Sequence, residues 1–357
     1  MTQYDVIVVG SGAGGGVVSG VLAEAGKRVL LLERGRPLSF EEVGRDHLRN
    51  QRMSLYGHNA GPELEGNPRV VVDSLGRPRT VKPHEGGYQN NAGCVGSGTR
   101  VYGGQAWRFM PQDFRMASTY GVPEGSSLAD WPITYDDLAP YYERAEWEVG
   151  VAGDAPAMTH LPAGRRPYPL PPVEVTERGR HLRRAAGALG WDTFPIPLLI
   201  NTVPYGGRKA CIRCQHCVGF ACPTDGKNGT QNTLIPRAVA TGRCDLVTGA
   251  MAEKVTTDGA GRVIGVSYFD RDGQRQEARA EVVVVSGGAV ETARLLFNSA
   301  TPQEPDGLGN QGDQLGRSLQ GHYYPTVAGL MPEPVYDGVG PGACTATCRF
   351  NHGNDGI

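Results

Sequence analysis

The sequence of 357 residues carries almost no net charge and has no long apolar segment. Its 35 lysines and arginines against 37 aspartates and glutamates produce no field that favours nucleic acid or an anionic membrane as a partner. Uninterrupted apolar stretches such as Val282–Val285 fall far below the roughly 18 residues that cross a bilayer. Met1 is not followed by the basic segment, twin arginine or small-residue cleavage site of a secretory leader. We therefore expect a cytoplasmic protein without a membrane or nucleic-acid partner. The sequence does not decide whether the protein forms an oligomer.

Glycine, by contrast, is abundant. The chain has 52 glycines and 26 prolines, together about a fifth of its residues, which is below the roughly 25–30% of low-complexity chains. The glycines are clustered rather than periodic, which excludes collagen. At roughly 100–200 residues per domain, the length predicts two domains or one large one. Clustered glycines indicate tight turns or a backbone that approaches a ligand closely.

The first glycine cluster predicts a dinucleotide-binding unit. It follows Tyr4–Val9, an apolar segment typical of buried parallel strands. The glycines at 10, 12 and 15 match G-x-G-x-x-G, a helix is expected over about 15–25, and a second strand leads to Glu33. In this order the glycines allow the turn and the approach to a pyrophosphate, while the acid accepts hydrogen bonds from a ribose. The fold does not separate NAD from FAD, but Glu33-Arg34-Gly35 near the chain start favours FAD.

The second cluster, Gly93–Gly104, has five glycines in twelve positions. It suits a backbone wrapped against a flat ligand rather than a stable helix. Here, and again at Asp130–Tyr142, Gly287–Leu296 and Gly307–His322, the sequence resembles the glucose–methanol–choline (GMC) oxidoreductases. The resemblance extends over nearly the whole chain and is strongest to bacterial sugar-active members, namely gluconate or glucose dehydrogenase flavoproteins, pyranose oxidases and glycoside 3-oxidases.

The resemblance implies an α/β fold, with a Rossmann-like FAD-binding domain and a discontinuous substrate-binding domain that contains an antiparallel sheet. The FAD domain is expected over 1–38, 85–115 and 230–320, a lid or connecting segment over 39–84, and the substrate domain over 116–229 and 321–357. Two hairpin turns are expected, at Asp258-Gly259 and Asp272-Gly273. The residues expected to bind FAD are Gly10, Gly12, Ala13, Gly14, Gly15, Glu33, Arg34, Gly96, Gly98, Thr99, Tyr102, Gly103, Gly104, Ala252, Gly287, Gly288 and Glu291.

The resemblance also implies a reaction. It is the oxidation of a CH–OH group of a sugar or glycoside, at ring carbon 3 or 2, by hydride transfer to flavin N5, with dioxygen or another acceptor. Two alternatives are a dehydrogenase flavoprotein subunit that passes electrons to a cytochrome, and an inactive FAD-binding fragment that needs a partner. The family's catalytic histidine with its partner histidine or asparagine is expected beyond Ile357, so the catalytic residues are unknown. Val101 stands where covalent members have the flavin-linked histidine, which predicts non-covalent FAD.

Four cysteines lie within twelve positions, at Cys211, Cys214, Cys217 and Cys222. The pattern C-x2-C-x2-C-x4-C-P is one residue longer in its last gap than the ferredoxin run. An iron–sulfur cluster is one interpretation, and a zinc site completed by Cys222 or His216 is another. The third interpretation, thiols that brace a long loop without any metal, is the one we favour because the spacing is imperfect.

Overall fold

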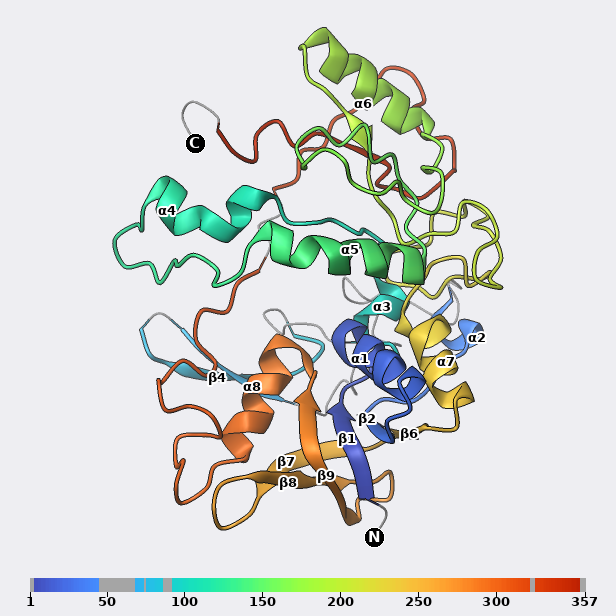
Figure 1. The fold of residues 1–357 in the computed structure, drawn as a ribbon. Helices are drawn as coiled ribbons and strands as arrows, with labels where there is room; N and C mark the ends of the chain where they lie inside the picture. The colour runs from blue at the N-terminus through green and yellow to red at the C-terminus, as the bar shows by residue number, and fades with distance from the viewer. Residues whose placement is uncertain (1–2, 45–67, 74, 86–91, 322–324, 354–357) are drawn as a thin grey trace. The chain divides into compact units, whose positions relative to one another are not determined.

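The computed structural model describes residues 3–44, 68–73, 75–85, 92–321 and 325–353 (Figure 1). The chain forms two compact units. The first comprises Met1–Tyr102, Val218–Ala221 and Gly229–His322, and the second Gly103–Cys217, Cys222–Asn228 and Tyr323–Ile357. Residues 103–115 thus belong to the second unit, whereas the sequence assigned them to the FAD domain. Most of the expected lid (45–67) and His322 lie outside the described residues.

The first unit is built on a six-stranded sheet of order β6-β2-β1-β9-β8-β7. The four strands at one side are parallel: β6 (Cys244–Thr248), β2 (Val29–Glu33), β1 (Gln3–Val9) and β9 (Arg275–Val285). The long β9 also pairs antiparallel with β8 (Val263–Phe269), which in turn pairs antiparallel with β7 (Met251–Thr257). These three consecutive strands form a meander. This mainly parallel sheet with crossover helices confirms the α/β class predicted from the sequence.

The apolar runs of β1 and β2 are continuous because both faces of the sheet are buried. Val6 and Val8 pack into one core with α1 (Ala13–Glu24) and α7 (Leu234–Ala240). Ile7 and Val9 pack into the other, which includes residues of the meander and of α8 (Gly288–Asn298). Figure 1 shows α1 and α7 beside each other in this unit.

The remaining elements of the first unit are short. The β3–β4 hairpin (Arg69–Val72 and Pro78–Val81) is a separate two-stranded sheet. The other elements are α2 (Phe40–Val43), α3 (Gly98–Val101) and the 3₁₀ turn Thr230–Asn232. The single helical turn α3 falls within the second glycine cluster, where no stable helix was expected.

Both expected hairpins of the meander are present. In the first, Asp258 accepts backbone hydrogen bonds from Ala260 and Arg262, and the left-handed residue is Gly261 (φ 80°) rather than Gly259. In the second, Gly273 is left-handed (φ 73°), as the Asp272-Gly273 pair predicts.

The second unit is mainly helix and loop. Its helices are α4 (Met116–Tyr120), α5 (Tyr135–Val149), α6 (Glu177–Ala188) and the 3₁₀ turn Pro111–Arg115. The longest of them, α5, begins with a capping box in which Thr134 accepts from the Asp137 N–H and Asp137 accepts from the Thr134 N–H. The antiparallel pair β5 (Phe194–Pro195) and β10 (Thr345–Ala346) is the described sheet structure of this unit.

Across the described parts of the chain, no helix combines the length and the apolar character that a bilayer crossing requires.

Candidate cofactor site

The turn from β1 into α1 is closed by glycines that no larger residue could replace without movement. Gly10 has a left-handed backbone (φ 97°), and its N–H donates to the Leu32 carbonyl at 2.8 Å. A Cβ on Gly10 would lie 2.4 Å from the Ser286 carbonyl oxygen, and one on Gly15 would lie 1.9 Å from the Gly10 carbonyl oxygen. The motif therefore packs the start of α1 directly on the ends of β1 and β9, as the glycine pattern predicts.

The N-terminus of α1 is open. Its N-cap residue is Gly12, and no described side chain caps it. Ala13 and Gly14, in the first turn, are exposed. The first four N–H groups of a helix have no partner within the helix, and together with the helix dipole they favour a bound anion. A twelve-residue helix with an uncapped, exposed first turn is suited to a pyrophosphate.

Glu33, at the end of β2, is only 5% exposed and is already hydrogen-bonded. Its Oε2 accepts from the Ser11 N–H (3.0 Å) and the Ser11 hydroxyl (2.6 Å), and its Oε1 accepts from the Gly35 N–H (2.7 Å). A carboxylate offers about four acceptor positions. Three of these positions are occupied, so one acceptor position, on Oε1, is left for a ribose hydroxyl. Both hydroxyls of a ribose diol would need two.

The second glycine cluster lies against the first. Gly12 approaches Ser97, since a Cβ on Gly12 would be 3.4 Å from that of Ser97, and Gly35 lies against the Gly93 backbone. Gly96 (φ 85°) and Ser97 (φ 47°) are both left-handed. A serine in this region is strained, and such strain is concentrated at functional sites. The next residue, Gly98, is exposed, and a Cβ there would meet no atom within 4 Å.

Glu291, in the first turn of α8, is surrounded by arginines. Its carboxylate lies 2.7 Å from Arg69, 3.7 Å from Arg34 and 3.5 Å from Arg294. Partial burial works to raise the pKa of Glu291, but the hydrogen bond from Arg69 and the three positive charges lower it overall. Two residues expected to bind FAD, Arg34 and Glu291, are thus paired with each other. Gly287 is the N-cap of α8, and Gly288 after it is exposed.

The remaining expected residues divide between the units. Ala252 lies in β7 and packs against a core that includes Leu32, and two residues before it the Ala250 N–H donates to the Glu33 carbonyl at 3.0 Å. Thr99 and Tyr102 belong to the first unit, where the Thr99 hydroxyl donates to the Gly96 carbonyl at 2.6 Å. Gly103 and Gly104 belong to the second unit, where the Gly104 carbonyl accepts from the Leu199 N–H at 2.6 Å.

We call the first-unit set the carboxyl-edge site, because it gathers at the carboxyl ends of β1, β2 and β9. It comprises residues 10–15, 33–35, 93–102 and 286–291. Sequence reasoning missed Ser11, Ser97 and Thr230 here. Ser11 stands at a position for which the motif specifies no residue type, and Thr230 lies outside both glycine clusters.

The residues present fit a flavin dinucleotide on two observations. Exposed N–H groups at the start of α1 face no described protein cap, and the neighbouring Gly98 leaves space where a side chain would stand. In open α/β sheets, ligands bind beside the carboxyl ends of the strands, where this site lies. Fold and site together define an α/β protein that binds a dinucleotide.

The comparisons with known proteins identify the family. The model of the GMC oxidoreductase family matches residues 128–324, more than half of the chain. The chain belongs to the GMC oxidoreductase family, which confirms the resemblance drawn from the glycine motifs and FAD as the cofactor.

Two curated relatives extend the match. The chain is 35% identical to 6'''-hydroxyparomomycin C oxidase of Streptomyces lividus, over 88% of this chain and 54% of the relative. It is 34% identical to 2-methyl-1,2-propanediol dehydrogenase of Mycolicibacterium austroafricanum, over 92% of this chain and 57% of the relative. The chain therefore spans about half the length of the curated relatives it matches.

Among solved structures, pyridoxine 4-oxidase from Mesorbium loti aligns over 84% of this chain and 52% of its own length, with a TM-score of 0.53 at 18% identity. At this identity the likeness shows the fold alone.

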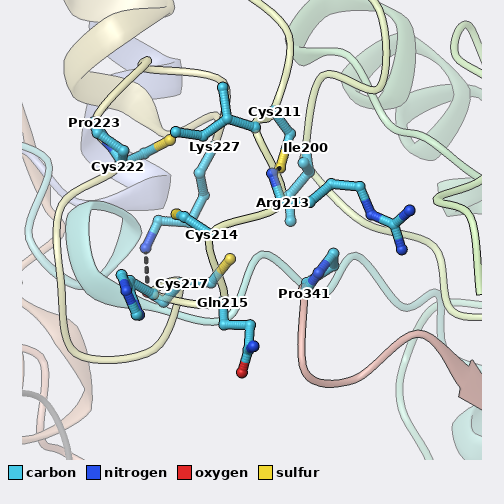
Figure 2. Close-up of a pocket in the computed structure, with 12 residues that line it drawn as sticks. Ile200, Cys211, Arg213, Cys214, Gln215, Cys217, Cys222, Pro223, Lys227 and Pro341 are labelled. Carbon is cyan, nitrogen blue, oxygen red and sulfur yellow. Dashed lines mark hydrogen bonds between the residues drawn. The ribbon is translucent and has the colours of Figure 1, made fainter. Parts of the chain in front are cut away.

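The four clustered cysteines line a small cavity in the second unit. Figure 2 shows Cys211, Cys214, Cys217 and Cys222 around it, with the Lys227 ammonium donating to the Cys217 carbonyl. The Arg213 N–H donates to the Cys211 sulfur at 3.3 Å. Burial and the neighbouring thiols raise the pKa of Cys217 to about 12, although Lys227 opposes this.

The cavity volume is about 10 Å³, enough for roughly one water molecule. No group of three or more His, Cys, Asp or Glu side chains in the described residues is arranged to hold a metal ion. As placed here, the thiols do not fit a cluster or a zinc ion.

Proposed function

We propose that this protein is an FAD-dependent oxidoreductase that oxidises a CH–OH group of a sugar or a related polyol. The observation that carries the proposal is the carboxyl-edge site, in which an open α1 N-terminus, the acid Glu33 and a strained glycine loop are brought together. The names of the two relatives described above specify an oxidase and a dehydrogenase of a hydroxylated compound.

In the proposed site, Ala13–Gly15 bind the pyrophosphate through backbone N–H groups, and Glu33 accepts one ribose hydroxyl. The Gly96–Tyr102 segment lies along the flavin, with Gly98 at the point of closest approach. The nucleotide half of FAD lies beside four other expected residues, Arg34, Gly287, Gly288 and Glu291. The roles of Ala252, Gly103 and Gly104 in binding FAD are proposed from the family resemblance alone. The first unit acts as the FAD domain and the second as the substrate domain.

Bound FAD supplies the hydride acceptor for alcohol oxidation. The chain's own residues hold the cofactor and set its orientation. We assign no catalytic base, because no histidine of residues 1–357 stands in the paired context of the family's catalytic site.

We also propose that FAD is held without a covalent bond. Val101, which stands where covalent members have histidine, is fully buried and packs with Val43, Ala92, Cys94 and Ala221. A side chain directed into this core is not available to a ligand at the loop surface.

The substrate class is tested by anaerobic reduction of the flavin in the full-length protein. Addition of glucose, a methyl glycoside or an aminoglycoside should bleach the flavin absorbance, and a vicinal diol is the comparison substrate. Product analysis then decides the carbon: we propose ring carbon 3 or 2, whereas the 6''' position in one relative's name makes an exocyclic carbon the competing outcome. Failure of every alcohol to reduce the flavin would refute the proposal.

A dehydrogenase is the second candidate, because one relative is named as such. Under this alternative the reduced flavin reacts slowly with dioxygen and rapidly with a dye or a cytochrome. Reoxidation rates with dioxygen and with a dye, measured on the same reduced sample, separate the two candidates. For the oxidase candidate, we also propose that the protein is located in the cytoplasm.

A further inference from the structure

We propose that Ser11 is a positioning residue that couples the ribose end of the cofactor site to its flavin end. This inference rests on the proposed function, because it assigns the two ends to FAD. Ser11 is completely buried. It lies in the first glycine motif, at a position where the motif itself specifies no residue type.

Every polar group of Ser11 has a partner. Its N–H and its hydroxyl both donate to Glu33 Oε2, at 3.0 and 2.6 Å. The hydroxyl oxygen accepts from the Gly96 N–H at 3.0 Å, and the carbonyl accepts from the Thr230 hydroxyl at 2.9 Å. One side chain thus bridges the acid at the end of β2 and the loop that precedes α3.

The hydrogen bonds of Ser11 orient a different group at each end of the site. Two donors on Oε2 fix the carboxylate so that the acceptor position left for a ribose lies on Oε1. The hydroxyl oxygen holds the Gly96 N–H immediately before the strained Ser97, which in turn lies against Gly12. Thr99 supports the same loop, because its hydroxyl donates to the Gly96 carbonyl and accepts from the Thr230 N–H at 3.2 Å.

Removal of the hydroxyl should therefore disturb both ends at once. In Ser11→Ala, Glu33 loses a charge-assisted hydrogen bond and the buried Gly96 N–H loses its acceptor, which leaves an unsatisfied donor. The carboxylate is then held only by the Ser11 and Gly35 N–H groups among the described donors, and the loop is free to adopt a less strained backbone. We expect FAD to bind about 10- to 100-fold more weakly, the range that the loss of a hydrogen bond to a charged group gives.

Helix α1, which follows the motif, provides a matched control. Ser19, in α1, is also completely buried, and its hydroxyl has no hydrogen-bond partner among the described residues. Ser19→Ala removes an equal group from an equally buried site without breaking a bond. Ser11→Cys retains the size and a weak donor, and it should give an effect between those of Ser11→Ala and Ser19→Ala.

The test uses the full-length protein, stripped of flavin and titrated with FAD and, separately, with ADP as a probe of the ribose end. Visible circular dichroism of the bound flavin reports the other end, and thermal unfolding of the apoprotein reports folding. For Ser11→Ala we expect weaker ADP binding and an altered flavin signal, with Ser11→Cys intermediate and Ser19→Ala unchanged.

The outcomes distinguish this inference from the proposed function. A wild-type apoprotein that binds no FAD would overturn both. Wild-type binding with Ser11→Ala indistinguishable from Ser19→Ala would overturn the inference alone. Weaker ADP binding with an unaltered flavin signal would also overturn it, because Ser11 would then act at one end only. If Ser11→Ala fails to fold, the same comparisons are made between Ser11→Cys and Ser19→Ala.

Discussion

At the scale of single residues, the glycines of the cofactor site have separable roles in folding and in binding. Gly15 has no space for a side chain, because its Cβ would lie 1.9 Å from a backbone oxygen. Gly15→Ala should therefore lower the free energy of unfolding of the apoprotein by about 2–4 kcal/mol, through a forced backbone shift. Denaturant unfolding of the apoprotein measures this loss.

Gly98→Ala is the matched comparison within the same site. Its added methyl meets no atom within 4 Å, so the stability of the apoprotein should change by less than about 0.5 kcal/mol. If the exposed Gly98 lies against the flavin, the substitution should weaken FAD binding. Equal stability losses in the two variants would contradict the described packing.

The arginine cluster at Glu291 predicts a loss of stability in acid. The pKa of Glu291 is lowered in the folded protein despite its partial burial, because of the hydrogen bond from Arg69 and the charges of Arg34 and Arg294. A carboxyl with a depressed folded pKa stabilises the fold above its unfolded pKa, and this contribution is lost as the pH falls through the folded value.

Glu291→Gln should therefore be less stable than the wild type at neutral pH, and the difference should shrink as the pH falls below the ordinary carboxyl range. Thermal unfolding of both proteins from neutral to acidic pH measures the difference. A gap that stays constant across this range would show that the charge of Glu291 contributes nothing.

At the scale of elements, α5 is fixed by a buried ion pair. Arg108, with 1% of its side chain exposed, donates from Nε and Nη2 to the two Glu146 oxygens at 2.6 Å and from Nη1 to the Tyr135 hydroxyl. Burial acts to lower the pKa of Arg108, but the hydrogen bonds to Glu146 raise it above its ordinary value. The guanidinium therefore stays charged at any pH that the fold survives.

Arg108→Met should destabilise the second unit by about 3–5 kcal/mol, because Glu146 would be left as a buried unpaired charge. The double variant Arg108→Met/Glu146→Leu should recover most of that loss, since well-packed apolar residues often replace a buried pair without penalty. Denaturant unfolding of the single and double variants measures both effects. A double variant as unstable as the single one would show that Arg108 acts through packing rather than through its charge.

The elements that the sequence predicted are those set by local patterns. β1 and β2 were identifiable because strands buried on both faces are continuously apolar. The turn into α1 was identifiable because only glycine fits it. The left-handed residue of the first meander turn was missed, because Asp258-Gly259 is the more familiar hairpin pair while the chain uses Gly261.

What could not be predicted depends on residues far apart in sequence. Ser97 adopts a strained backbone that no local pattern of serine indicates, and the Arg34–Glu291 pair forms only when β2 and α8 are brought together. The role of Ser11 follows from hydrogen bonds to two distant segments. The cysteine spacing left three interpretations open, because the cavity that the thiols line is completed by residues far from them in sequence, such as Ile200 and Pro341.

At the scale of the whole molecule, clustered glycines from three distant segments are brought together. Nine of the 52 glycines lie in three turns that meet at the carboxyl edge of one sheet, where we propose that FAD binds. The chain spans about half the length of its curated relatives.

The most direct test of the account is the flavin content of the purified full-length protein and its fate on acid precipitation. We predict one FAD per chain, released entirely into the supernatant, because Val101 is buried and offers no atom for a covalent link. A colourless protein that binds no added FAD would contradict the cofactor site itself. Yellow colour retained in the precipitate would contradict the account of how the site holds FAD.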